Sequence, residues 1–165
     1  MEKKFTHFDE NGNSIMVDIS KKKDTNREAV AQGKIKVSTD VYNKILNCSI
    51  SKGDVLGVAQ IAGIMGMKKT SDIIPLCHNI NLLKCTIEFK MSDEEREIIV
   101  IGYAKNFGQT GVEMEALSGV TIALLTIYDM CKGIDKNMLI SDIHLIKKNG
   151  GKSGNFLYKG GEFND

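Results

Sequence analysis

The sequence predicts an α+β fold in which helices pack against one antiparallel sheet. Three observations support this prediction: apolar and polar residues alternate over 29–37 and again over 83–91, and apolar residues recur at helical spacing over 111–132. The chain has 165 residues, of which 42% are hydrophobic and 26% charged, values typical of one compact globular domain. We therefore expect a single domain over residues 1–165, with flexible ends at about 1–14 and 148–165.

The first half of the chain predicts a strand followed by helices. In the strand, expected over 27–37, one side carries only small or apolar residues, Ala29, Ala31, Gly33, Ile35 and Val37. Ser38-Thr39-Asp40 supplies the N-cap of a short helix that continues to about Asn47, and the capping-box pattern Ser51-x-x-Asp54 predicts a second helix. Pro75, the only proline, ends the helical region because its ring forces Ile74 into an extended conformation.

The second half predicts a hairpin, a long helix and a last strand. Alternation from Leu83 to Met91 indicates a strand, and a polar turn over 92–97 joins it to a more buried strand over 98–105. The helix over 111–132 begins with acidic residues and ends at Lys132-Gly133, and 139–146 has the pattern of a strand. This order is that of a ferredoxin-like split β-α-β sandwich with an extra helix in its first crossover.

Composition excludes several functional classes. The net charge is only +1, so the whole-molecule field does not favour nucleic acid as a partner. The basic N-terminus is followed by no apolar stretch, and the longest apolar run, 120–128, is too short to span a bilayer. Four irregularly spaced cysteines without a Cys-x-x-Cys pair indicate free thiols. We expect a cytoplasmic protein without a membrane partner and without a metal site.

Two segments place polar groups where a ligand could meet them. His78 follows Pro75-Leu76-Cys77 on a loop, although spacing alone favours an ordinary surface histidine. Glu113 and Glu115 begin the long helix, whose free N–H groups can hold an anion or a carbonyl group. The two carboxylates could accept hydrogen bonds from a purine, but acids are also favoured generically in a first helical turn.

Charged groups elsewhere have two readings each. Asp129 lies in the last turns of the long helix, where an acid opposes the helix dipole, and Lys132 is on the same face at i, i+3. The two form either a simple ion pair or a proton donor and acceptor. Cations near element ends could converge on a polyphosphate or could simply be solvated; these are Lys21, Lys22, Lys23, Arg27, Lys52, Lys68, Lys69 and the glycine-rich segment 147–154.

Five segments in order give the chain a resemblance to a known family. They are Met16-Val17-Asp18-Ile19-Ser20, Pro75-Leu76-Cys77-His78, Gly111-Val112-Glu113-Met114-Glu115-Ala116-Leu117, Thr126-Ile127-Tyr128-Asp129-Met130-Cys131-Lys132 and Gly150-Gly151-Lys152-Ser153-Gly154. Together they resemble the signature segments of molybdenum-cofactor biosynthesis protein C, the cyclic pyranopterin monophosphate synthase family. The family has the ferredoxin-like architecture predicted above.

The resemblance implies a function. The expected enzyme is a lyase of molybdenum cofactor biosynthesis that converts 3′,8-cyclo-7,8-dihydroguanosine 5′-triphosphate to cyclic pyranopterin monophosphate and pyrophosphate. The resemblance further implies Asp129 as the catalytic acid and Lys52 and Lys132 as essential lysines. The residues implied to bind substrate are Leu76, Cys77, His78, Glu113 and Met114, with Glu115 beside them, and the further site cations are Arg27, Lys148 and Lys152. No cofactor is expected to be required, and Mg²⁺ on the substrate phosphates stays open.

One departure and two alternatives accompany this reading. The family commonly has proline directly after the histidine, where this chain has Asn79, so His78 is expected to be held less firmly. A non-catalytic nucleotide-binding or sensing module would use the same cations. Zinc bound through Cys77, His78, Cys85 and His144 is a third reading, for which we expect substoichiometric metal.

Helix geometry and the resemblance together predict a shared site. Glu113 and Asp129 are sixteen positions apart on one predicted helix, which separates them by roughly 24 Å. The Glu113 and Asp129 side chains of one chain are therefore too far apart to contact the same purine. The resemblance implies a hexamer, a trimer of dimers, and we expect the site to combine residues of two subunits.

Overall fold

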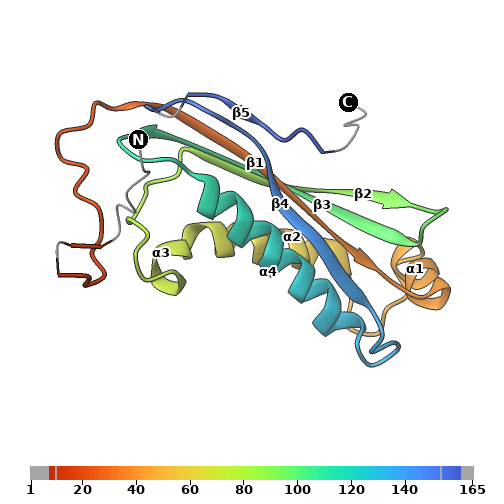
Figure 1. The fold of residues 1–165 in the computed structure, drawn as a ribbon. Coiled ribbons are helices and arrows are strands. Elements are labelled where there is room, and N and C mark those ends of the chain that lie inside the picture. The colour runs from red at the N-terminus through yellow and green to blue at the C-terminus, as the bar shows by residue number, and fades with distance from the viewer. Residues whose placement is uncertain (1–7, 10, 153, 161–165) are drawn as a thin grey trace.

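The computed structural model describes residues 8–9, 11–152 and 154–160. Within this part of the chain, five strands form one antiparallel sheet in the order β2-β3-β1-β4-β5. The strands are β1 (Thr25–Lys36), β2 (Lys84–Ser92), β3 (Glu97–Gly108), β4 (Leu139–Asn149) and β5 (Phe156–Leu157). The helices are α1 (Thr39–Leu46), α2 (Val55–Lys68), α3 (Thr70–Ile73) and α4 (Glu113–Cys131). Figure 1 shows α2 and α4 against the same face of the sheet, so the predicted α+β ferredoxin-like fold is confirmed.

The central strands β1 and β3 follow the predicted alternation. They pair over their whole length, from Thr25 opposite Gly108 to Lys36 opposite Glu97. The inward side chains of β1 are fully buried, as the period of two requires. At Gly33 a Cβ would lie 2.8 Å from Leu124 Cδ1 and 3.0 Å from Val120 Cγ1. Glycine therefore allows α4 to pack closely on β1.

Helices α1 and α2, which follow β1, both begin at side-chain caps. Ser38 caps α1 by accepting a hydrogen bond from Val41 N at 3.4 Å, as predicted. The capping box that the sequence placed at Ser51 is wrong, because Asp54 itself is the N-cap of α2 and accepts from Gly57 N at 3.0 Å. Ile74, before Pro75, is extended at φ −103° and ψ 106°, so the predicted end of the helical region is confirmed.

The later strands agree with the prediction except at their ends. Leu83 precedes β2 and is 66% exposed, so it does not belong to the inward set that the sequence assigned it to. The sequence did not predict β5, whose two residues pair with Lys147 and Lys148 of β4. Residues 148–149 thus complete β4, within the segment expected to be flexible. Flexibility of the ends stays a prediction; residues 1–7, 10, 153 and 161–165 lie outside the described part of the chain.

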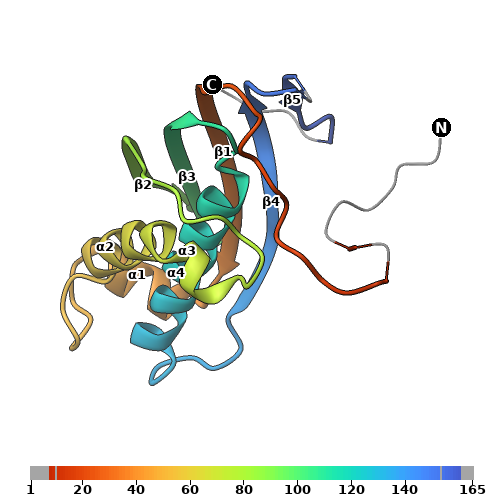
Figure 2. The ribbon, with the colours of Figure 1, turned by 90° about the vertical axis from the view of Figure 1, so that its left-hand side faces the viewer.

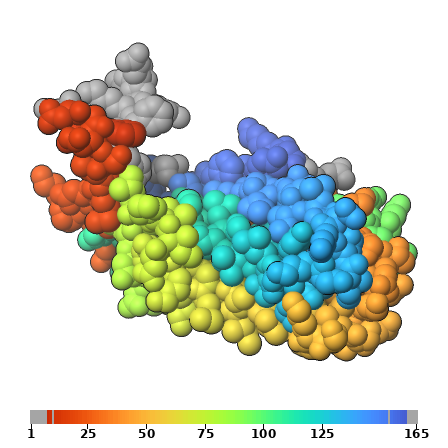
Figure 3. Space-filling view, turned by 90° about the horizontal axis from the view of Figure 1, so that it is seen from below, coloured from red at the N-terminus to blue at the C-terminus, as the bar shows by residue number. Residues whose placement is uncertain are grey.

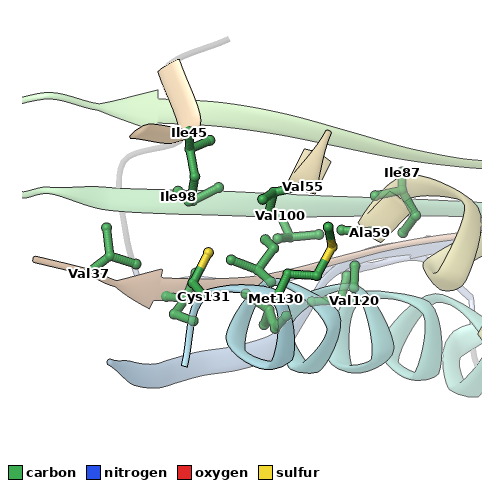
Figure 4. Packing of buried hydrophobic residues seen from close by; sticks show 14 of the residues in the cluster. Val37, Ile45, Val55, Ala59, Ile87, Ile98, Val100, Val120, Met130 and Cys131 are labelled. Carbon is green, nitrogen blue, oxygen red and sulfur yellow. The ribbon is translucent and has the colours of Figure 1, made fainter. Parts of the chain in front are cut away.

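The core lies between the sheet and the helices. Figure 4 shows Val100 of β3 and Ile87 of β2 meeting Val55 and Ala59 of α2, with Val120 and Met130 of α4 beside them. Although the apolar run 120–128 is too short to span a bilayer, α4 as a whole is long and apolar enough to cross a membrane by length and composition alone. Half of α4 is buried in the fold. Packing against the sheet accounts for its apolar character, and the helix lies with one end at each end of the sheet (Figure 1).

Candidate active site

A pocket of about 500 Å³ lies at the N-terminal end of α4. Three segments and one further residue enclose it: residues 17–22 before β1, the loop 76–80 between α3 and β2, residues 110–115 at the start of α4, and Lys152 after β4. Figure 1 shows these segments gathered at one end of the molecule. The structure brings together here the six predicted substrate-binding residues of loop and helix, which are Leu76, Cys77, His78, Glu113, Met114 and Glu115.

Glu115 is the buried acid of this pocket. Its side chain belongs to the first turn of α4 and is only 3% exposed. Desolvation is the main cause that raises the pKa of Glu115 from an ordinary 4.5 to about 7, and the nearby charge of Glu113 contributes to this rise. Burial likewise raises the pKa of the Cys77 thiol, with a smaller contribution from Glu115. The pocket therefore contains a carboxyl group that can gain or lose a proton near neutral pH, next to a thiol that stays protonated.

His78 is tied to the chain segment before β1. Its Nε2 lies 2.8 Å from the carbonyl oxygen of Val17, a residue 61 positions earlier in the sequence. The imidazole is partly buried and lines the pocket. His78 is therefore not an ordinary surface histidine, which was the reading that spacing alone favoured.

A second hollow, of about 430 Å³, adjoins the first and is lined by cations. The two hollows share a wall, because both are lined by Lys22, Thr110, Gly111, Glu113 and Lys152. Arg27 and Lys148 complete the second hollow. The sequence left open whether cations converge, and four of them do. Lys22 comes from the segment before β1 and Arg27 from β1, whereas Lys148 belongs to β4 and Lys152 to the turn after it.

Local contacts hold two of these cations, Arg27 and Lys148, in place. The Arg27 guanidinium donates from Nε to Gly108 O at 3.1 Å and from Nη2 to Gln109 O at 3.2 Å. Lys148 Nζ lies 2.9 Å from Glu113 Oε1, which joins β4 to the first turn of α4. Gly151 has φ +82° and passes so close to the Arg27 guanidinium that any Cβ would collide with it. A glycine is therefore required where the turn after β4 crosses Arg27.

The predicted catalytic residues form a separate cluster at the C-terminal end of α4. Lys132 Nζ lies 2.6 Å from Asp129 Oδ1. Lys52, from the connection between α1 and α2, donates to the Asp129 backbone oxygen at 2.9 Å and lies 3.7 Å from Asp129 Oδ2. The hydrogen bond from Lys132, with the charges of Lys132 and Lys52, lowers the pKa of Asp129, and Asp129 in turn raises the pKa of Lys132. At neutral pH the cluster is a carboxylate between two ammonium groups.

The two clusters lie at opposite ends of α4. Helix α4 runs without a break from Glu113 to Cys131, which at about 1.5 Å per residue separates Glu113 from Asp129 by roughly 24 Å. The three catalytic candidates are thus brought together with one another but not with the pocket. Within the described residues, no group of three or more His, Cys, Asp or Glu side chains could hold a metal ion, and the set Cys77, His78, Cys85 and His144 does not assemble.

Sequence reasoning missed part of the pocket wall. Val17, Ile19 and Thr110 line the first pocket, and Gln109 lines the second hollow. Val17 and Ile19 alternate within the segment 16–20, which had been noted only for its resemblance, and that alternation was a usable signal. Nothing in the sequence singled out Gln109 and Thr110, whose position depends on how β3 leads into α4.

Comparisons with known proteins identify the family of this chain. Residues 16–151 match the MoaC family. The chain is 54% identical over 158 residues to the "Cyclic pyranopterin monophosphate synthase" of Clostridium perfringens (strain 13 / Type A), covering 96% of this chain and all of that protein. Proteins of the same name from Clostridium acetobutylicum and Peptoclostridium acidaminophilum are 55% and 57% identical, covering 94% and 92% of this chain and 97% and 96% of their own lengths. The predicted family is confirmed: the chain belongs to the MoaC family.

Proposed function

We propose that this protein is a cyclic pyranopterin monophosphate synthase, a lyase of molybdenum cofactor biosynthesis. Its substrate is 3′,8-cyclo-7,8-dihydroguanosine 5′-triphosphate, and its products are cyclic pyranopterin monophosphate and pyrophosphate. The observation that carries the proposal is the convergence of the predicted substrate-binding residues on two adjoining hollows, one mixed in polarity and one lined by cations. Relatives of that name, similar over nearly the whole chain, support it.

The two hollows suit the two parts of this substrate. In the first, Glu113 and Glu115 offer carboxyl groups to the N–H edge of a purine, while Leu76, Met114 and Ile80 offer apolar contacts to its rings. In the second, Lys22, Arg27, Lys148 and Lys152 offer cations to a triphosphate. The base thus occupies the first hollow and the phosphates the second.

Asp129, Lys132 and Lys52 supply the proton transfers. Opening the five-membered ring of the purine and building the pyran ring both require protons to move. Lys132 is protonated and lies against the Asp129 carboxylate. The lysine can therefore donate a proton, and the carboxylate can accept one. Closure of the cyclic phosphate expels pyrophosphate, whose growing negative charge the cations stabilise.

The reacting centre combines both ends of α4 from two subunits. One chain supplies the binding hollows, and Asp129 with its lysines comes from a neighbour, because roughly 24 Å separates these groups within one chain. Exposed apolar side chains on the helical face support assembly with other subunits; they are Val58, Ile61 and Met65 of α2 and Leu125 of α4, each 46–62% exposed. The assembly that we propose is the hexamer of the resemblance. The protein acts in the cytoplasm without a required cofactor, and Mg²⁺ binds, where present, through the substrate phosphates.

Turnover tests the proposal. The full-length protein is incubated with the cyclised dihydro-GTP intermediate, and pyrophosphate is measured together with the fluorescent, oxidised pterin derivative of the product. Both should appear in equal amounts. A protein that binds the intermediate and releases neither product is a nucleotide-binding module instead of an enzyme.

A further inference from the structure

The segment before β1 lies along the outside of the pocket and forms one of its walls. We call residues 13–23 the strap. Figures 2 and 3 show it leaving the start of β1 and passing beside the loop 74–83, at the edge of the molecule. Most of the strap is exposed; only Val17 and Ile19 are partly buried, and both side chains line the pocket with Lys22. The strap therefore contributes apolar wall to the first hollow and a cation to both.

Few polar contacts hold the strap in place. Ser20 N donates to Asp18 Oδ1 at 2.8 Å, and Lys22 N donates to Ile19 O at 2.9 Å, so these hydrogen bonds stay inside the strap. Among the described residues, the hydrogen bond that joins the strap to the body of the protein is the one between His78 Nε2 and Val17 O.

The chemistry of this contact determines which nitrogen of His78 carries a proton. A backbone carbonyl oxygen has no hydrogen and can only accept, so at 2.8 Å His78 Nε2 must donate. The Nε2 proton is then used in the hydrogen bond to Val17 O, and only Nδ1 is left to bind another group. Because Nε2–H is hydrogen-bonded to the backbone, His78 is better suited to a positioning role than to proton transfer through Nε2.

We propose that His78 is a positioning residue, whose Nε2–H fastens the strap across the pocket and so places Val17, Ile19 and Lys22 for substrate binding. This inference rests on the proposed function for its kinetic consequence alone. Loss of the hydrogen bond frees the strap, which lines the binding hollows, and removes no group of the Asp129 cluster. The expected effect is therefore on substrate binding.

Two amide substitutions separate the roles of the two ring nitrogens. His78→Gln places an amide N–H near the position of Nε2 and can still donate to Val17 O, whereas the shorter His78→Asn places an amide near Nδ1. We expect His78→Ala and His78→Asn to raise KM about tenfold with kcat within about threefold of wild type, as loss of a binding contact does. His78→Gln should restore KM to within about threefold of wild type.

Limited trypsin digestion measures how firmly the strap is held, and it does not depend on enzymatic turnover. Lys21, Lys22 and Lys23 provide cleavage sites at its end, next to the start of β1. Cleavage there should be several-fold faster in His78→Ala and His78→Asn than in wild type, and His78→Gln should match wild type. Thermal unfolding midpoints of all three variants verify that the rest of the protein is folded.

The outcomes distinguish the alternatives. Loss of kcat in all three variants at unchanged KM and unchanged cleavage would mean that His78 transfers protons, and the positioning role would be wrong. Rescue by His78→Asn but not by His78→Gln would assign the role to Nδ1 and also overturn it. If wild type itself releases no product, the proposed function fails, and the cleavage pattern alone still decides whether His78 holds the strap.

Discussion

The two ends of α4 differ in how much of a working site each contains. At the N-terminal end, a hollow of about 500 Å³ is lined by Glu115, whose pKa burial raises to about 7, and a second hollow of about 430 Å³ adjoins it. At the C-terminal end, Asp129, Lys132 and Lys52 form ion pairs on the surface, with side chains 60%, 52% and 48% exposed. The first end has the shape to bind a ligand; the second has reactive charges without enclosing walls.

This difference shows why one chain is insufficient in the proposed mechanism. An exposed ion pair contributes little to the stability of the fold, because water screens its charges, so these residues have no folding role. The attraction between a surface carboxylate and two lysines becomes strong only when a low-dielectric wall excludes water from them. A neighbouring subunit that brings its binding hollows over the Asp129 cluster would supply that wall. Each prediction below tests one side of this comparison, from the largest expected effect to the smallest.

Removal of either exposed lysine should have the largest effect. Lys52→Ala and Lys132→Ala should each lower kcat at least about 1,000-fold, because charge stabilisation at the reacting centre is lost, while the thermal midpoint changes little. Steady-state kinetics and thermal unfolding provide the measurements. The matched control is Lys44→Ala, which removes a similarly exposed lysine paired with Asp40 at 2.7 Å in α1 and should keep full activity. Near-wild-type rates in both site variants would end the catalytic assignment.

Mixing two inactive variants should restore activity if the site is shared. Asp129→Ala lacks the catalytic cluster and Glu113→Ala lacks a binding carboxylate. After subunit exchange at equal concentrations, about a quarter of the sites in a two-fold dimer should have both groups intact. Turnover of the mixture against each variant alone is the measurement, and labelled subunits verify exchange. Verified exchange without recovery would place both clusters in one chain's site.

Neutralising the buried acid should change how stability depends on pH. The folded pKa of Glu115, about 7, is above its ordinary 4.5, so Glu115 binds more protons in the folded state and its contribution to stability is lost as pH rises from about 4.5 to 7. At about 1.4 kcal/mol per pKa unit the loss is up to roughly 3 kcal/mol. Glu115→Gln should therefore be more stable than wild type at pH 8 and should lose that advantage towards pH 5.

Urea unfolding at several pH values measures this difference. The exposed Glu88 of β2 provides the control, since Glu88→Gln should follow the wild-type curve. Parallel curves for wild type and Glu115→Gln would mean that Glu115 ionises as an ordinary exposed carboxylate, and the contrast between the two ends of α4 would weaken.

Loss of one cation from the second hollow should have the smallest effect. Lys152→Ala removes one of four converging cations, so we expect KM to rise about tenfold with kcat nearly unchanged. Steady-state kinetics with the cyclised intermediate measures the change, and Lys136→Ala, an exposed lysine near the C-terminal end of α4, is the control. A fall in kcat at constant KM would instead place Lys152 at the reacting centre.

Much of the fold could be predicted because periodicity is a local property. Ala29 to Val37 and Cys85 to Met91 alternate in sequence and in burial, and Ser38 caps α1 where the sequence placed its N-cap. The errors are local as well. Ser51 and Asp54 both have cap chemistry, and the structure uses Asp54. The two-residue strand β5 is too short for any period and forms only because it pairs with β4.

The sequence by itself determined the order of elements, the family and the span that separates Glu113 from Asp129, because each depends on residue types along one continuous stretch. Only the tertiary structure decided which stretches meet. Val17 reaches His78 across 61 positions, and Lys22, Arg27, Lys148 and Lys152 line one hollow. Such meetings depend on strand register and on the closure of loops between distant elements, for which local patterns contain no signal.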